Sequence, residues 1–283
     1  MRNLLSVDEL AGWIAAGRAP RILDVRWRLG CPDGHAEYLS GHVPGAVYVS
    51  LGTELSAPGR PEEGRHPLPT TAALQASARR WGLRAGDRVV AYDNAQGAAA
   101  ARAWWLLRQA GVDVRVLDGG LRAWVAAGHA LEPGEVTPPA GDVELAVLGR
   151  DAITIDEAAA FPSAGILLDV RAPERYRGES EPLDPVAGHI PGAINLPTSV
   201  HLDSDGRLLD AETLRAQFAQ AGVTADTPVA AYCGSGVTAA HTALALAEAG
   251  LEAKLFPGSW SQWSNTSGRP VATGPAAGIP RRS

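Results

Sequence analysis

The chain of 283 residues repeats itself, and this duplication constrains its fold more than any single motif. RILDVR at 21–26 recurs as ILLDVR at 166–171, and SGHVPGAVYVSL at 40–51 recurs as AGHIPGAINLPT at 187–198. Two later pairs follow in the same order, VVAYDNAQGAAAAR with PVAAYCGSGVTAAH and VLDGGLRAW with LFPGSWSQW. A repeat on this scale indicates one domain fold present twice, and the length suits two ordinary domains.

The two copies meet in a stretch that is rich in proline and glycine. Between Ala130 and Asp151 the chain reads LEPGEVTPPAGDVELAVLGR and shows no helical periodicity. Such composition is typical of an exposed crossing between domains. We therefore expect one domain over residues 1–138 and a second over residues 150–283.

Within each copy, short apolar runs alternate with longer helical patterns. In the second copy the predicted strands are Ile166–Val170, Ala193–Leu196, Val229–Tyr232 and Ala253–Phe256. The predicted helices are Thr154–Phe161, Asp210–Ala221 and Thr238–Ala249. Apolar strands separated by helices predict an α/β fold, a parallel sheet flanked by helices on both faces. The C-terminal ends of such strands share one edge, where a site is expected.

Charge and composition exclude several classes of protein. A net charge of −6 argues against a nucleic acid or an anionic membrane as partner. The N-terminus, interrupted by Asp8 and Glu9, does not resemble a signal peptide, and a cytoplasmic location is expected. The two cysteines, Cys31 and Cys233, lack zinc-site spacing, so we expect free thiols and no metal.

The most informative stretch is AYCGSGVTAAH, in which Cys233 follows a predicted strand and precedes a predicted helix. Gly234 and Gly236 permit a turn whose N–H groups point inward, and such a turn at a helix N-terminus favours an anion. Cys233 is therefore a candidate nucleophile. The alternative is a small buried apolar residue. The first copy has Asp93 at this position, which favours a function for the thiol in the second copy alone.

Two other interpretations of this loop fit less well. GSGVTA satisfies the G-x-G-x-x-A dinucleotide-binding pattern, but it lies late in its domain instead of after the first strand. A cysteine phosphatase would need an arginine six positions after the cysteine, where this chain has Ala239.

The motifs DVR, GHIPGA, YCGSGVTA and PGSW, with the same scaffold lacking cysteine in the first half, resemble the two-domain rhodanese family of sulfurtransferases. The resemblance covers essentially the whole chain. It implies an inactive first domain, an active second domain and a site in the cleft between them. Cys233 would take up a sulfane sulfur as a persulfide and pass it to cyanide, a small thiol or a thioredoxin-like protein. No cofactor is implied, and the oligomeric state stays open.

The resemblance also assigns roles to neighbouring residues. Arg175 matches the arginine that binds the anionic donor, with Gly234, Gly236 and Val237 completing the donor-binding loop. Asp169 and Arg171 match a structural pair that recurs as Asp24 and Arg26. Arg177, nearby, is either a further anion ligand or part of a solvated loop.

Ser235 and Thr238 are the polar side chains of the loop. Thr238 is expected to cap the helix or to hydrogen-bond the sulfur. In mercaptopyruvate-type members, a serine at position 235 is proposed to assist proton transfer with a histidine and an aspartate of the first domain. The matching residues here are His42 and Asp33. His189 occupies the same motif position as His42, so a structural role for His42 is equally open.

The donor preference follows from the same loop. Thiosulfate-type members carry basic residues at the positions of Gly234 and Ser235, so the loop resembles the mercaptopyruvate type. That type has a further arginine after Glu-Pro, whereas this chain continues with Leu183 and Asp184. Arg177 or Arg28 could replace it. We expect 3-mercaptopyruvate as donor, with thiosulfate as the alternative and a non-catalytic sulfur-carrier module as a different class.

The remaining residues at family positions have simpler interpretations. His241 and Trp263 are expected to pack in the second domain, and Trp260 matches a family position. Cys31 has no counterpart in the second copy and is interpreted as incidental. His66, in GRHPLP, is expected to be an ordinary loop residue, with a residue that borders the cleft as the alternative.

Overall fold

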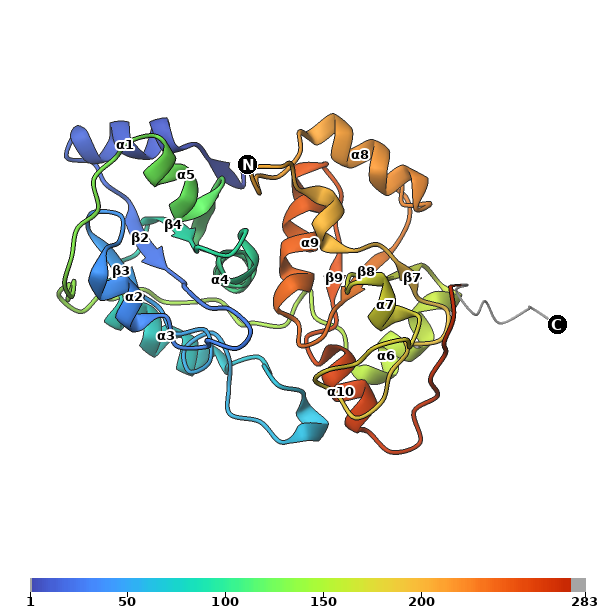
Figure 1. Cartoon of the computed structure of the whole chain (residues 1–283). Coiled ribbons are helices and arrows are strands. Elements are labelled where there is room, and N and C mark those ends of the chain that lie inside the picture. Colours follow the sequence, from blue (N-terminus) through green and yellow to red (C-terminus); the bar gives the residue numbers. More distant parts are fainter. Residues whose placement is uncertain (1, 276–283) are drawn as a thin grey trace. The chain divides into compact units, whose positions relative to one another are not determined.

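The computed structural model describes residues 2–275 and divides them into two compact units (Figure 1). Unit 1 holds the chain up to Ala57, residues Leu68–Arg150 and the segment Ser204–Leu208. Unit 2 holds the segment Pro58–Pro67, residues Asp151–Asp203 and the chain from Leu209 onward. Each unit is thus built mainly from one copy of the repeat but takes one short segment from the other copy.

Unit 1 is built on a five-stranded parallel sheet with the order β1-β5-β4-β2-β3. Its strands are β1 (Leu4–Leu5), β2 (Arg21–Asp24), β3 (Ala46–Tyr48), β4 (Arg88–Tyr92) and β5 (Asp113–Leu117). Its helices are α1 (Val7–Ala15), α2 (His35–Ser40), α3 (Thr71–Arg80), α4 (Ala98–Gln109) and α5 (Gly120–Ala126). The helices flank the sheet, and residues of α1 and α5 share a core with the central strands.

Unit 2 is built on a four-stranded parallel sheet with the order β7-β6-β8-β9. Its strands are β6 (Ile166–Asp169), β7 (Ile194–Asn195), β8 (Val229–Tyr232) and β9 (Lys254–Leu255). Its α-helices are α6 (Ile155–Ala160), α7 (Pro173–Tyr176), α8 (Ala211–Gln220), α9 (Val237–Glu248) and α10 (Ser259–Asn265). Short 3₁₀ turns lie at η1 (Pro61–Glu63), η2 (Phe161–Ser163) and η3 (Thr198–His201).

The α/β fold with parallel sheets is confirmed in both units. Each strand and helix predicted for the second copy is present, and no end differs by more than one residue. The helix starts follow from local sequence, since Asp210 caps α8 and Thr154 forms a capping box with Glu157 at the start of α6. Helix α7 and helix α10 were not predicted, because both are short and lack an apolar periodicity.

The two exchanged segments occupy related places in the repeat. Pro58–Pro67 lies before α3 in the chain, and Ser204–Leu208 lies before α8. In unit 2 the exchanged segment packs on α10, where the amide of Gln262 donates to the carbonyl of Glu62. Gly64 has a φ of +86° there, and a Cβ on it would lie 2.8 Å from the carbonyl oxygen of Gly258. This segment brings two polar side chains to the site of unit 2.

Candidate functional site

The cysteine loop joins β8 to α9, as the sequence predicts. All four residues of β8 are buried, and Cys233 follows with a free thiol that is 1% exposed. Gly236 is the N-cap of α9, and its φ of +78° is in the left-handed region. A Cβ at Gly236 would also collide with the carbonyl oxygen of Pro257. The turn therefore requires glycine at this position.

The corner between β9 and α10 holds the loop in place. The hydroxyl of Ser259 accepts a hydrogen bond from the backbone N–H of Cys233 over 3.1 Å and donates to the carbonyl of Phe256 over 2.9 Å. The N–H groups of Trp260 and Ser261 donate to the carbonyls of Cys233 and Gly234 over 3.0 and 2.8 Å. These bonds fix the backbone on which the thiol is carried.

The sulfur faces the start of α9. The backbone N–H of Gly236 donates a hydrogen bond to Sγ of Cys233 over 3.1 Å. The first N–H groups of a helix lack acceptors within it, and its N-terminus carries partial positive charge. The loop therefore directs a hydrogen-bond donor and the positive end of α9 at the sulfur, the atom that would act as nucleophile.

Unit 1 contains the related turn with a carboxylate inside it. Asp93 follows β4 as Cys233 follows β8, and its side chain is buried. Its carboxylate accepts hydrogen bonds of 2.8 to 3.0 Å from the backbone N–H groups of Ala95, Gly97, Ala99 and Ala100. Burial raises the pKa of Asp93, and these hydrogen bonds oppose the rise. The turn of unit 1 thus directs its N–H groups at its own side chain.

An alternating chain of ion pairs runs through the site of unit 2. In order, its members are Asp169, Arg171, Glu181, Arg175, Asp184 and Arg65. The exposed fraction of the three arginine side chains rises along it, from 2% at Arg171 to 17% at Arg175 and 31% at Arg65. The chain therefore leads from a buried structural pair to two partly accessible guanidinium groups.

The inner pair has the structural surroundings that its duplication suggests. Arg171 binds the carboxylate of Asp169 and donates to the carbonyl of Gly188 over 2.6 Å. In unit 1, Arg26 binds Asp24 and donates to the carbonyl of Gly41 in the same way. Both pairs are buried and tie the end of a strand to the GH(V/I)PGA turn.

Arg175 and Arg65 both lie beside Gly234. Glu181 holds Arg175 through two hydrogen bonds of 3.1 and 2.6 Å, and Asp184 accepts one more over 3.4 Å. Arg65 pairs with the other oxygen of Asp184. Burial raises the pKa of Asp184, and the charge of Arg65 opposes that rise. A Cβ on Gly234 would lie 3.1 Å from Nη2 of Arg65 and 3.4 Å from Nη1 of Arg175.

The partner of Ser235 is His66. Its Nδ1 lies 2.8 Å from the hydroxyl oxygen of Ser235, two residues beyond Cys233. His66 belongs to the exchanged segment that packs in unit 2. This contact contradicts the expectation of an ordinary loop residue and favours the alternative, a residue that borders the site.

His42 and Asp33, the expected partners of Ser235, have other contacts in unit 1. His42 is fully buried, stacks on Tyr38, and has both ring nitrogens hydrogen-bonded to backbone carbonyls. The carboxylate of Asp33 accepts from the backbone N–H of His35 over 2.9 Å and from the hydroxyl of Tyr48 over 3.3 Å. His189 is likewise buried and stacks on Tyr176. The histidine of the repeated turn is therefore buried and stacked on a tyrosine ring in both units.

The remaining loop predictions have mixed outcomes. Thr238 does not cap α9, because the N-cap is Gly236 and Thr238 is the second residue of the helix. Val237 is the buried first residue of α9. Arg177 pairs with Glu179 in a solvated loop and does not join the ion-pair chain.

Residues expected to pack do so. Trp263 is buried and donates to the carbonyl of Pro270, and Trp260 is buried below the guanidinium of Arg171. His241 is buried in α9, with Nδ1 3.0 Å from the hydroxyl of Thr198.

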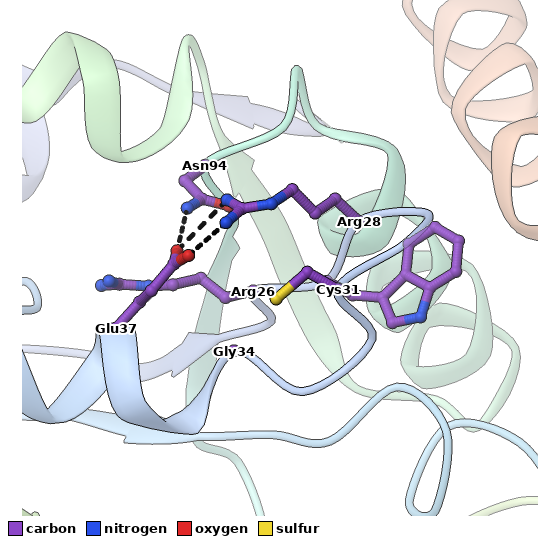
Figure 2. Close-up of a pocket in the computed structure, with 7 residues that line it drawn as sticks. Arg26, Arg28, Cys31, Gly34, Glu37 and Asn94 are labelled. Atoms are coloured by element: carbon purple, nitrogen blue, oxygen red, sulfur yellow. Dashed lines mark hydrogen bonds and ion pairs between the residues drawn. The ribbon is translucent and has the colours of Figure 1, made fainter.

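The corresponding strand ends of unit 1 form a pocket without a cysteine on the loop (Figure 2). Arg28 pairs with Glu37, which also accepts a hydrogen bond from Asn94 over 3.0 Å. Cys31 lines the pocket from a different segment, and its thiol lies 3.6 Å from the carbonyl oxygen of Asp33. Arg28, one expected substitute for the missing family arginine, is thus bound within unit 1.

Four residues that build the site have no site role predicted from the sequence, namely Arg65, Glu181, Asp184 and Ser259. One signal in the sequence could have indicated a site role for Arg65 and His66. The two residues place a cation next to a titratable group in a proline-flanked loop. The meaning of this signal depends on the segment exchange, which no local pattern encodes.

Comparison with known proteins identifies the family. The model of the Rhodanese-like domain matches residues 6–127 and again residues 154–266. A Mycobacterium tuberculosis protein described as "Putative thiosulfate sulfurtransferase SseB" is 50% identical over 277 residues, covering 96% of this chain and 98% of the relative. A Pseudomonas aeruginosa protein described as "Probable 3-mercaptopyruvate sulfurtransferase" is 48% identical over 282 residues, with the same coverage.

Solved structures agree with the sequence comparison. The crystal structure of SseA from Escherichia coli, whose description concerns 3-mercaptopyruvate sulfotransferases, superposes with a TM-score of 0.80 at 33% identity. The match covers 92% of this chain and 99% of SseA. The chain therefore belongs to the tandem rhodanese-domain sulfurtransferases, as the sequence motifs indicate.

Across residues 2–275, no helix combines the length and the apolar character needed to span a membrane. Within the same residues, histidine, cysteine and carboxylate side chains do not gather in a group suited to a metal ion.

Proposed function

We propose that the protein transfers a sulfur atom from 3-mercaptopyruvate to a thiophilic acceptor through a persulfide on Cys233. The observation that carries this proposal is the loop itself, in which the thiol meets the N–H of Gly236 while Ser235 binds His66 two residues away. Unit 1 has Asp93 in place of the thiol, so the chemistry belongs to unit 2. The Pseudomonas aeruginosa relative, described as "Probable 3-mercaptopyruvate sulfurtransferase", supports the donor assignment, whereas the description of the Mycobacterium tuberculosis relative names thiosulfate, the alternative donor.

In the first half-reaction the thiolate of Cys233 attacks the sulfur of the donor. A sulfur–sulfur bond forms, the carbon–sulfur bond breaks, and the electron pair passes to the carbon and its adjacent carbonyl as an enolate. Protonation of that carbon gives pyruvate, and Cys233 retains the sulfur as a persulfide. In the second half-reaction the acceptor, for example cyanide, takes the outer sulfur and leaves the thiolate of Cys233.

The Ser235–His66 pair suits this donor. The enolate needs a proton, which the hydroxyl of Ser235 can donate. His66 can then return a proton from solvent to the oxygen of Ser235. Thiosulfate would instead release sulfite, which departs without a proton. A hydrogen-bonded hydroxyl and imidazole beside the nucleophile therefore favour the α-keto thiol, with thiosulfate as the second donor to test.

The test compares the two donors on one preparation, with cyanide as acceptor. We expect a higher kcat/KM for 3-mercaptopyruvate, and a higher value for thiosulfate would overturn the donor assignment. His66→Gln should lower kcat/KM for 3-mercaptopyruvate by about 100-fold, the lower end for general acid–base catalysis, and should leave thiosulfate nearly unchanged. His35→Gln, in an exposed pair with Glu135, is the control. Equal losses with both donors would contradict the proton-transfer role.

The nucleophile is tested separately. Cys233→Ser should abolish transfer from either donor, whereas Cys31→Ser should retain wild-type activity because Cys31 lies on another unit's pocket. A sulfur-carrier module makes a different prediction, since it would form the Cys233 persulfide once but turn over slowly with small acceptors. Multiple turnovers with cyanide or dithiothreitol would exclude it.

A further inference from the structure

Two guanidinium groups converge on the residue that follows the proposed nucleophile. Nη2 of Arg65 and Nη1 of Arg175 lie 3.1 and 3.4 Å from the place that a Cβ of Gly234 would occupy. Arg175 comes from α7, whereas Arg65 comes from the exchanged segment. Glycine at 234 leaves open the space in front of both groups.

Within the described part of the chain, each guanidinium keeps one N–H₂ group without a protein acceptor. Nη1 of Arg65 pairs with Asp184, and Nε and Nη2 of Arg175 bind Glu181 and Asp184. Over residues 2–275, the structure gives no acceptor to Nη2 of Arg65 or to Nη1 of Arg175, the two atoms nearest Gly234. A guanidinium donates through five N–H groups in a fixed plane and suits carboxylate or related oxyanions.

Asp184 sets the spacing of the pair. Its side chain is only 1% exposed, and it binds Arg65 through one oxygen and Arg175 through the other. The backbone N–H of Arg65 also donates to the hydroxyl of Ser261 over 3.2 Å. The segment and the side chain are thus both anchored, so that binding an anion requires little rearrangement.

The ion-pair chain carries no net charge with which to attract an anion. The ion-pair chain contains three arginines and three carboxylates, so its formal charges cancel. Net positive charge therefore cannot account for anion binding here. Attraction must come from the unused N–H groups and from the N-terminus of α9.

We propose that Arg65 is a second donor-binding residue, whose Nη2 acts with Nη1 of Arg175 to bind the anionic oxygens of the sulfur donor. This inference rests on the proposed function of Cys233. The shared chemistry is an oxyanion next to a transferable sulfur, as in the carboxylate of an α-keto thiol or the oxygens of thiosulfate. Asp184 is the positioning residue that holds Arg65.

The test is the rate of Cys233 persulfide formation in Arg65→Gln, measured in single turnovers with 3-mercaptopyruvate and with thiosulfate. Loss of a charged hydrogen bond should lower kcat/KM for loading by about 10- to 100-fold. Transfer from the preformed persulfide to dithiothreitol, an uncharged acceptor, should stay unchanged. Arg177→Gln is the matched control, because Arg177 is 34% exposed and also pairs with a carboxylate outside the ion-pair chain.

The outcomes separate binding from structural roles. Slower loading with either donor and normal discharge supports the proposal, and the donor that loses more identifies the oxyanion that Arg65 favours. Unchanged loading with both donors, or equal slowing of both half-reactions, overturns it. If Arg65→Gln does not fold, Arg65→Lys keeps the charge but cannot bind Asp184 and the donor through two separate N–H₂ groups, and wild-type loading in that variant would contradict a role for Nη2 of Arg65. A wild type that prefers thiosulfate would revise the donor assignment without affecting this test.

Discussion

Because its imidazole is buried, His241 should lower the unfolding free energy of the protein in weak acid. The imidazole lies in α9, the helix that follows the cysteine loop, and is 3% exposed. Burial, with a smaller contribution from His201, lowers the pKa of His241 to about 4. The unfolded chain therefore binds a proton at this residue at a higher pH than the folded protein does. Stability conferred by the neutral ring is complete above about pH 6.5 and is lost as the pH falls toward 4.

The size of this loss follows from the two pKa values. With an unfolded pKa of about 6.5, a folded value of about 4 makes the unfolding free energy about 2 kcal/mol lower at pH 5 than at pH 7. His189 and His201 are also buried with lowered pKa values, so their neutral rings add to the loss in weak acid.

Urea unfolding at pH 7 and at pH 5 isolates the contribution of His241. His241→Asn keeps a polar atom near the hydroxyl of Thr198 but cannot take up the proton. The variant should be less stable than wild type at pH 7, yet its stability should fall less between the two pH values, by about 2 kcal/mol. His35→Gln, whose parent side chain is 41% exposed, controls for losing an imidazole. An identical fall in wild type and His241→Asn would refute the reasoning.

Two further predictions concern the strand-to-helix turns. Asp93→Ala should leave four backbone N–H groups without their acceptor and lower the unfolding free energy by about 3 kcal/mol or more. The kcat/KM of the folded variant should stay at the wild-type value. A large activity loss without unfolding would contradict an inactive unit 1. Gly236→Ala should lower kcat/KM and stability, because its φ is +78° and a Cβ would collide with the carbonyl of Pro257. Gly268→Ala is the control, because Gly268 has a φ of +80° and nothing near its Cβ position, so it measures the backbone cost alone, about 1–2 kcal/mol. An equal loss of stability in Gly236→Ala and Gly268→Ala would exclude a collision with Pro257.

The fold was predictable because its signals are local and appear twice. Strands and helices of the second copy follow from runs of apolar residues and from caps such as Thr154 and Asp210. The duplicated Asp-Val-Arg motif predicted the structural pairs Asp24–Arg26 and Asp169–Arg171 before any contact was known. Residues present in both copies indicate the requirements of the fold, and residues present in only one copy indicate a function specific to that copy.

The site was less predictable because part of it crosses between the copies. Arg65 and His66 belong to the first half of the sequence but pack with Asp184 and Ser235 in unit 2. The family resemblance already pointed to a histidine from the first half of the sequence as the partner of Ser235. It matched that role to His42 of the GHVPGA motif, whereas the structure places His66 of the exchanged segment beside Ser235.

The departure at Leu183 and Asp184 shows how a local comparison can misjudge charge. A missing arginine followed by a carboxylate suggests a weaker anion site when the stretch is considered alone. In the folded unit the carboxylate of Asp184 instead binds Arg65 and places its guanidinium beside Gly234. A cation absent from one segment can be supplied by another, provided that a buried acid fixes its position.

The two turns also show why one unit is expected to react and the other is not. In unit 1 the N–H groups at the start of α4 are already satisfied by the carboxylate of Asp93, and Arg28 is already paired with Glu37. In unit 2 the thiol of Cys233 receives one N–H, and within residues 2–275 two arginines keep N–H groups without an acceptor beside Gly234. Catalysis requires groups whose interactions are completed only when substrate arrives. An internal carboxylate completes them in advance, which stabilises the turn but leaves no interaction for a donor.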